Sequence, residues 1–347
     1  MVRGWLWSDA VDKAPKKSRP YNNLGFSLLL DGKNEQALQP LSRGLALAPS
    51  DPELNNTMAI ASYLTGDIDK ALDACHTALA VNPESIEARN TLGFILRQKG
   101  EVKTAEACFS IVLARTPDNF EALMNMGLIK QLQGDLQNAQ SWFQKAVDVN
   151  PVSSQALYYV GSCLAARNQP GAATKYLKKA LALDAGDYRV HCMLAAIMLQ
   201  QQNPDAAVYH YKCALEIAPD CTVAGIGLAE ALFAKKDLQT AQACLDSTIR
   251  YAPGDETLLW KAVQLLTEAG RYKKAAAYLE TLTGFHPDNP KLLYNLACLY
   301  ARQNDKRKAV NTLKRAIDRG YNNWSQIKTD KDLKAITETA YYKAIIY

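Results

Sequence analysis

Hydrophobic and polar positions alternate along this 347-residue chain with a helical spacing that starts again at regular intervals. Within stretches of about a dozen residues, apolar side chains fall three or four positions apart, which is the pattern of an amphipathic helix. Polar residues with Gly or Asn interrupt these stretches, as short turns between helices require. The pattern therefore predicts an all-helical protein made of many short helices.

One alanine sets the register of these helices. It recurs every 34 residues without an insertion, at Ala37, Ala71, Ala105, Ala139, Ala173, Ala207, Ala241, Ala275 and Ala309. Twelve positions before it lies a small residue, namely Gly25, Ala59, Gly93, Gly127, Gly161, Ala195, Ala229 and Ala297, with Val263 as the exception. We expect both positions where two helices cross, because larger side chains there would push the backbones apart.

Two further signals mark the ends of the helices. Residues that accept a left-handed backbone lie between the small residue and the alanine: Gly32, Gly66, Gly100, Gly134, Asn168, Gly270 and Asn304. Proline follows the alanine by twelve positions at Pro49, Pro83, Pro117, Pro151, Pro219, Pro253 and Pro287, whereas Ala185 and Tyr321 break the rule. Since proline cannot continue a helix, each unit is predicted to be two helices joined by a short turn.

This unit resembles the tetratricopeptide repeat, which has Leu and Gly early, Ala in the middle and Pro late. Residues 19–25 and 122–127 are especially similar to that pattern. The resemblance covers residues 18–321, in units that begin near residues 18, 52, 86, 120, 154, 188, 222, 256 and 290. It implies an all-α solenoid of nine tandem helix-turn-helix units, stacked as a right-handed superhelix whose first helices line a concave face.

The two ends of the chain are expected to cover the solenoid. Residues 322–347 are predicted to form a C-terminal capping helix, with Leu333, Ile336, Tyr341 and Ile345 on one face. Residues 1–17 form an N-terminal lead, which we interpret as a capping helix. Residues 5–25 also resemble the junction between the last membrane helix and the first repeat in bacterial multi-spanning proteins with glycosyltransferase-like membrane parts.

Composition narrows the possible ligands. The net charge of +5 is modest for this length, and no basic stripe is interleaved with aromatic residues, so we expect no nucleic-acid partner. Eight cysteines include no C-x-x-C pair, and His210 and Cys213 supply only two candidate ligands on one helical face. We therefore expect no metal site. Free thiols favour a reducing compartment, whereas attachment to a membrane protein would place the repeats outside the cytoplasm, so both locations stay open.

Catalytic signatures are missing from the sequence. It has no phosphate-binding glycine loop with its lysine, no H-E-x-x-H, no G-x-S-x-G and no G-x-G-x-x-G. The carboxylates are scattered and form no evident acid-base pair. We expect a protein without enzymatic activity and without a cofactor.

The fifth residue of each unit points into the concave face in the related family, where some members carry a lysine that clamps an acidic tail. Here this position holds Asn22, Asn56, Asn90, Met124, Tyr158, Cys192, Ile226, Trp260 and Tyr294. None of them is lysine, so a partner with an acidic tail is not expected.

The concave face instead changes character along the chain. Its early part offers amides and other polar groups that suit an extended peptide backbone: Asn22, Asn23, Asn56, Tyr63, Asn90 and Arg97. From the fourth unit on it becomes apolar and aromatic, which suits a hot spot for a partner's side chains: Met124, Tyr158, Tyr159, Met193, Phe233, Trp260 and Tyr294. Asn125 and Asn295 are also predicted to lie on this face. The alternative is that several of these residues pack between adjacent helices.

Three functions are compatible with this sequence. The first is a scaffold that binds a peptide or helix of a partner protein in the concave groove. The second is an accessory or substrate-recognition domain of a bacterial membrane glycosyltransferase-like protein, associated with its membrane part. The third is a solenoid that assembles with copies of itself; the oligomeric state is not predicted.

Overall fold

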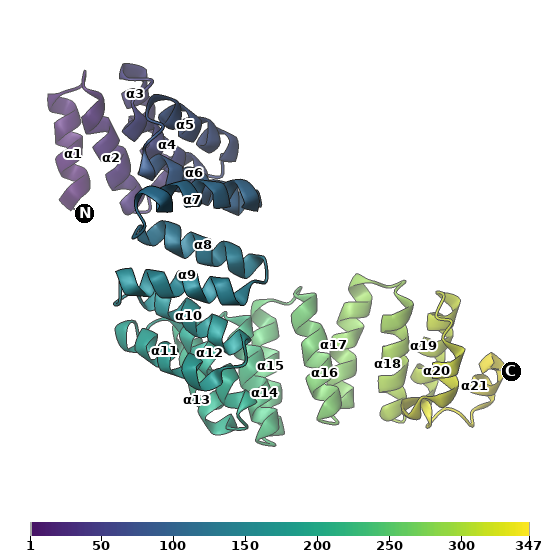
Figure 1. Ribbon diagram of the computed structural model, residues 1–347. Helices are drawn as coiled ribbons and strands as arrows, with labels where there is room; N and C mark the ends of the chain where they lie inside the picture. Colours follow the sequence, from purple (N-terminus) through teal and green to yellow (C-terminus); the bar gives the residue numbers. More distant parts are fainter. Residues whose placement is uncertain (1, 347) are drawn as a thin grey trace. The chain divides into compact units, whose positions relative to one another are not determined.

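The computed structural model describes residues 2–346, and the side chains of residues 7–344. Two compact units are present, the N-terminal unit Met1–Leu183 and the C-terminal unit Asp184–Tyr347. Helices make up both units, and no strand occurs between residues 2 and 346, so the predicted all-α solenoid is confirmed (Figure 1).

In the N-terminal unit, consecutive helices pack as antiparallel pairs joined by short turns. Its helices are α1 (Val2–Lys13), α2 (Ser18–Leu30), α3 (Asn34–Leu47), α4 (Pro52–Leu64), α5 (Ile68–Val81), α6 (Ile86–Lys99), α7 (Val102–Arg115), α8 (Phe120–Leu132), α9 (Leu136–Val149), α10 (Ser154–Ala166) and α11 (Pro170–Leu183). The first helices of neighbouring pairs also touch, α2 with α4, α4 with α6, and α6 with α8. The lead helix α1 packs on α2, and the Tyr21 hydroxyl donates to the Pro15 carbonyl at 3.1 Å.

The C-terminal unit continues the same scheme. Its helices are α12 (Tyr188–Gln200), α13 (Pro204–Ile217), α14 (Thr222–Ala234), α15 (Leu238–Tyr251), α16 (Glu256–Glu268), α17 (Tyr272–Phe285), α18 (Pro290–Arg302), α19 (Lys306–Asp318), α20 (Trp324–Thr329), the 3₁₀ helix η1 (Lys331–Leu333) and α21 (Ala340–Ile346). Here α12 touches α14 and α14 touches α16. First helices therefore form a row from α2 to α8 in the N-terminal unit and from α12 to α16 in the C-terminal unit.

The crossing points are packed as the repeat predicts. All nine register alanines, from Ala37 to Ala309, are 0% exposed. Where the small residue of the first helix is a glycine, it faces a larger side chain one turn beyond the alanine: a Cβ added to Gly127 would lie 2.5 Å from the Phe143 ring, and one added to Gly25 would lie 2.4 Å from Leu41. Close contact of this kind leaves no room for a methyl group.

The turns also follow the predicted rule, with two additions. Each predicted Gly or Asn turn residue has a positive φ, from 58° at Asn168 to 88° at Gly100. Gln202 and Lys236 occupy the same place in their units with φ of 58° and 63°. Both are in a left-handed conformation that costs an L-residue roughly 1 kcal/mol. The turn geometry is thus imposed by helix packing, even where the sequence does not favour it.

The C-terminal cap differs from the single helix that was predicted. It consists of α20, η1 and α21, because the backbone is extended at Asp330 and the Asp330 side chain caps η1. Ile327, Leu333, Ile336 and Tyr342 are buried against the last repeat, and Tyr341 is 75% exposed. The predicted helical face that included Tyr341 is therefore wrong, whereas Leu333 and Ile336 do cover the core. The side chain of Ile345, also assigned to that face, lies outside the described residues.

Candidate functional site

Three asparagines follow one another on the first helices of the N-terminal unit. Asn22 on α2, Asn56 on α4 and Asn90 on α6 are half-buried and occupy the same position in three successive repeats. The Oδ1 atom of each is buried and accepts no hydrogen bond from any described residue. We call this set the asparagine ladder.

A neighbouring helix cap fixes the orientation of the Asn90 amide. Asn119 caps α8, where its Oδ1 accepts from the Ala122 amide at 2.9 Å. The same Oδ1 also accepts from Asn90 Nδ2 at 3.1 Å. Because Asn119 offers an acceptor on this side, Asn90 must present its nitrogen to it, and the atom left without a partner is the Asn90 oxygen.

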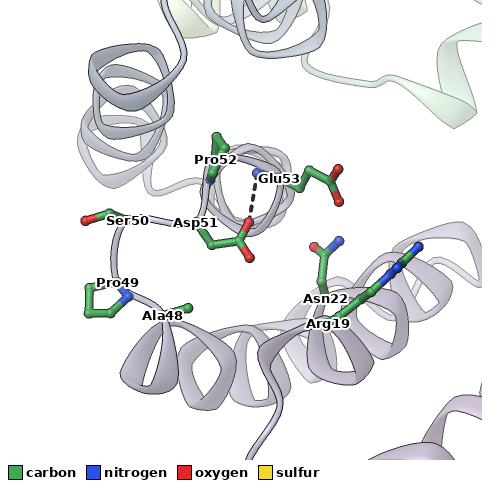
Figure 2. Close-up of a pocket in the computed structure, with 8 residues that line it drawn as sticks. All are labelled: Arg19, Asn22, Ala48, Pro49, Ser50, Asp51, Pro52 and Glu53. Atoms are coloured by element: carbon green, nitrogen blue, oxygen red, sulfur yellow. Dashed lines mark hydrogen bonds between the residues drawn. The ribbon is translucent and has the colours of Figure 1, made fainter.

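The first member of the ladder borders a hollow of about 650 Å³. In Figure 2 the Asn22 side chain points into the space between α2 and the start of α4, beside the exposed Arg19. The opposite wall includes Asp51, which caps α4 by accepting from the amides of Glu53 and Leu54 at 3.1 Å each. The hollow therefore combines an amide, a cation and a carboxylate already engaged with its own helix. Asn23, also predicted for this face, is half-buried on α2 and is not among the residues that line the hollow.

A mixed polar and aromatic chain crosses α4, α6 and α8. The Tyr63 and Phe94 rings meet edge to face at 5.1 Å, and the Arg97 guanidinium lies 5.5 Å from the Phe94 ring centre. Arg97 Nε donates to Asn125 Oδ1 at 3.0 Å, and burial lowers the pKa of Arg97. The structure thus brings Tyr63, Arg97 and Asn125 together. Phe94, which the sequence reasoning missed, connects them.

The aromatic residues predicted farther along are largely packing residues. Tyr159 stacks on Phe143 at 4.8 Å and meets Tyr158 edge to face at 5.3 Å, and Met124 is only 6% exposed. In the C-terminal unit, Met193 is half-buried, and Phe233 is half-buried against the core. These residues do not form one open aromatic surface.

Tyr294 belongs to the core of the C-terminal cap. It is 2% exposed, stacks on Tyr321 at 4.2 Å and donates its hydroxyl to Asp330 Oδ2 at 2.6 Å. Burial, followed by the bond to Asp330, raises the pKa of Tyr294. Tyr294 is therefore an interior residue, and its hydroxyl already donates to Asp330.

Trp260 and Asn295 line a separate pocket of about 400 Å³ in the C-terminal unit. Both are half-buried, and Trp260 packs partly against the core. The remaining walls come from α16, α17, α18 and the C-terminal cap: Val263, Gln264, Thr267, Glu268, Leu279, Tyr294, Cys298, Leu299, Gln326, Asp330 and Asp332. No sequence pattern pointed to Gln326, Asp330 and Asp332, because only the fold brings the cap beside α16 and α18.

The cysteines, His191 and His210 are buried or half-buried in the helices, whereas His76 and His286 are exposed. His191 Nδ1 lies 3.1 Å from His210 Nδ1, and burial lowers the pKa of His191. Cys213 interacts with Tyr209, and within the described part of the chain no three His, Cys, Asp or Glu side chains converge in a way that could hold a metal ion. Cys75, Cys108, Cys163 and Cys298 are buried, and burial raises the pKa of Cys75 to about 12. Of the helices described, none combines the length and apolar character needed to cross a membrane.

Comparison with known proteins agrees with this architecture. A family model described as tetratricopeptide repeat matches residues 62–127, 198–266 and 266–329, which together exceed half of the chain, and a second such model matches residues 124–188. No curated protein matches the sequence.

Solved structures share the fold at low identity. A chain of the APC/C hetero-tetramer Cut9–Hcn1 aligns with a TM-score of 0.61 and 22% identity, over 66% of this chain and 45% of that one, which is less than half of its length. For pilF of Pseudomonas aeruginosa the TM-score is 0.54, with 18% identity over 67% of this chain and 99% of that one. A tetratricopeptide repeat protein from Parabacteroides merdae aligns with a TM-score of 0.52 and 20% identity, over 73% and 98%. These similarities concern the fold alone.

Proposed function

The chain belongs to the tetratricopeptide repeat family, and we propose that it is a non-catalytic scaffold whose N-terminal unit binds an extended segment of a partner protein. The asparagine ladder is the observation that supports this proposal. Asparagine recurs at one register position of three successive repeats, and each copy keeps a buried oxygen without a donor. A buried acceptor in that state costs about 1–3 kcal/mol, so folding by itself gives no reason for these residues.

Peptide binding accounts for the ladder because each amide carries both a donor and an acceptor. The Nδ2 atoms of Asn22 and Asn56 donate to no described residue. Unlike the Oδ1 atoms of the same side chains, they are not buried, so both are accessible to solvent. They are placed to donate to backbone carbonyls of a bound segment. Oδ1 is buried in the free protein, so in this proposal the side chains turn on binding and Oδ1 then accepts from amides of the same segment. Contacts of this kind bind a backbone with little dependence on its side chains.

The adjacent chain of Tyr63, Phe94 and Arg97 supplies the side-chain contacts. Aromatic rings held edge to face beside a guanidinium give a surface that accepts apolar and planar groups of a ligand. The ordering of Arg97 by Asn125 reduces the entropy lost when a partner binds. Amides and aromatics together therefore favour an extended peptide with occasional large side chains.

Selection from a display library of short random peptides tests this proposal, since the natural partner is not needed. Selected peptides are labelled, and their affinities are measured by fluorescence anisotropy on the wild type and on a variant carrying Asn22→Ala, Asn56→Ala and Asn90→Ala. We expect the triple variant to bind more than about tenfold more weakly.

The matched control carries Ser42→Ala, His76→Ala and Ser110→Ala, three exposed positions on the second helices of the same repeats. This control should bind like the wild type. Equal loss in both variants, or unchanged binding by the asparagine variant, would contradict a site at the ladder.

The two other functions stay predictions. Attachment to a membrane glycosyltransferase-like protein is tested by reading the gene upstream for membrane helices. Self-assembly predicts a mass that rises with concentration in multi-angle light scattering, and a constant monomer mass would contradict it.

A further inference from the structure

The pocket beside Trp260 has a charge that its own fold does not balance. Three carboxylates line it, Glu268 at the end of α16, and Asp330 and Asp332 in the cap, whereas none of its lining residues is Lys or Arg. Arg302 pairs with Asp332 at 3.3 Å from outside the pocket lining. Glu268 and Asp330 take part in no ion pair with a described residue, so two negative charges remain uncompensated.

Neighbouring groups respond to this negative charge. After burial, the charge of Asp330 is the largest cause that raises the pKa of Cys298, and the Asp332 charge adds to it. The pKa of Tyr321 is raised by burial, then by Cys298 and Asp330. Asp330 and Asp332 thus act on groups in and around the pocket.

Asp330 is held in place by the fold and keeps capacity for another donor. Its Oδ2 accepts from the Tyr294 hydroxyl at 2.6 Å, and its Oδ1 accepts from the Asp332 amide at 2.9 Å. Oδ2 also accepts from the Cys298 thiol at 3.8 Å. Oδ1 has a second lone pair, so a further donor can bind there without displacing any of these contacts. A carboxylate positioned in this way needs no reorganisation when a cation arrives.

The other walls fit the stem of a long side chain. Val263, Leu279 and Leu299 are apolar, and the Trp260 indole is the aromatic ring that attracts cations best. An arginine or lysine extends an apolar stem along such a surface and keeps its charge at the polar end. Arginine also stacks on aromatic rings and donates to carboxylates in pairs.

We propose that this pocket binds a basic side chain, arginine in preference to lysine, from the partner protein. The inference rests on the proposed function in one respect only, namely that the arginine belongs to the partner protein. It assigns the C-terminal unit a specificity for charge, which the asparagine ladder does not provide.

Nuclear magnetic resonance of the indole N–H groups tests the pocket directly. The chain has five tryptophans, and the Trp260 signal is identified by its loss in Trp260→Phe. N-acetyl-arginine methylamide is titrated, with the lysine, norleucine and glutamate counterparts as comparisons. We expect a saturable shift of the Trp260 signal with arginine, a weaker one with lysine, and none with norleucine or glutamate, while the Trp142 signal in the N-terminal unit stays fixed.

Charge variants complete the test. Glu268→Gln removes a carboxylate that makes no hydrogen bond or ion pair with a described residue, and we expect it to weaken arginine binding by about three- to tenfold. Asp318→Asn removes another exposed charge, from α19 of the same unit, and should leave binding unchanged. Binding should also weaken as salt rises, because the attraction is screened.

Equal shifts with norleucine and arginine, or equal affinities of Glu268→Gln and the wild type, would overturn the proposal. These outcomes leave the asparagine ladder untouched, because the titration reports only on Trp260. Conversely, loss of the ladder's peptide binding does not alter the shift expected with arginine.

Discussion

One register position has opposite surroundings in the two units. In the N-terminal unit it holds Asn22, Asn56 and Asn90, each with a buried oxygen that has no partner. At the end of the C-terminal unit it holds Tyr294, whose ring is stacked and whose hydroxyl is bonded to Asp330. The repeat therefore prescribes how helices cross but leaves the row of first helices free to carry either an unsatisfied polar surface or a fully packed one.

The largest expected effect concerns what the two units share. Phe143 faces Gly127, and Leu245 occupies the equivalent position in the C-terminal unit; both are 0% exposed. Both substitutions leave cavities, so Phe143→Ala should lower the free energy of unfolding by about 3–5 kcal/mol and Leu245→Ala by about 2–5 kcal/mol. Urea unfolding followed by circular dichroism measures both. The exposed Ser141→Ala serves as the control, and a small loss at either core site would show that the units are not packed alike.

The next effect separates the units. Tyr294→Phe removes a hydrogen bond to a carboxylate and should cost about 1.5–3 kcal/mol. Asn56→Ala removes an acceptor that has no partner, so it should cost nothing or stabilise by up to about 1 kcal/mol. Thermal unfolding of the two variants shows whether stability falls in Tyr294→Phe and stays equal or rises in Asn56→Ala. A clear loss of stability in Asn56→Ala would mean that the ladder serves folding, and would weaken the case for peptide binding.

Overpacking of the crossings tests the register itself. Ala139→Leu and Ala241→Leu place a larger side chain at equivalent crossings and should each cost about 1–3 kcal/mol. Melting temperatures report the change. If either variant melts like the wild type, the alanine at that place does not lie at a tight crossing.

The smallest effect lies in the turns. Lys236→Gly should stabilise the C-terminal unit by about 0.5–1 kcal/mol. Glycine adopts a positive φ without strain, and this gain exceeds the conformational entropy that glycine loses on folding. Gly134→Ala, at the same place in the N-terminal unit, should destabilise by about 1 kcal/mol. Differential scanning calorimetry of the two variants gives opposite shifts if the turn geometry is the same in both units.

The helix pairs, their turns and their crossings could be predicted from the sequence, because they depend on contacts that recur every 34 residues. The register alanines and the predicted Gly and Asn turns appear as the pattern required. Gln202 and Lys236 adopt the same turn without a sequence signal, since the packing of the flanking helices outweighs a local preference.

Which side chains of the first helices stay accessible depends on the folded arrangement and could not be predicted from the repeat. The position of Tyr294 in its repeat predicted an exposed ring, yet residues 322–346 fold back on the last repeat as short helices and bury it. The same segment brings Asp330 and Asp332 beside Trp260 and so creates the acidic pocket. The repeat pattern does not predict the burial of Tyr294 or the acidic pocket, because the contacts are made by a segment that does not repeat.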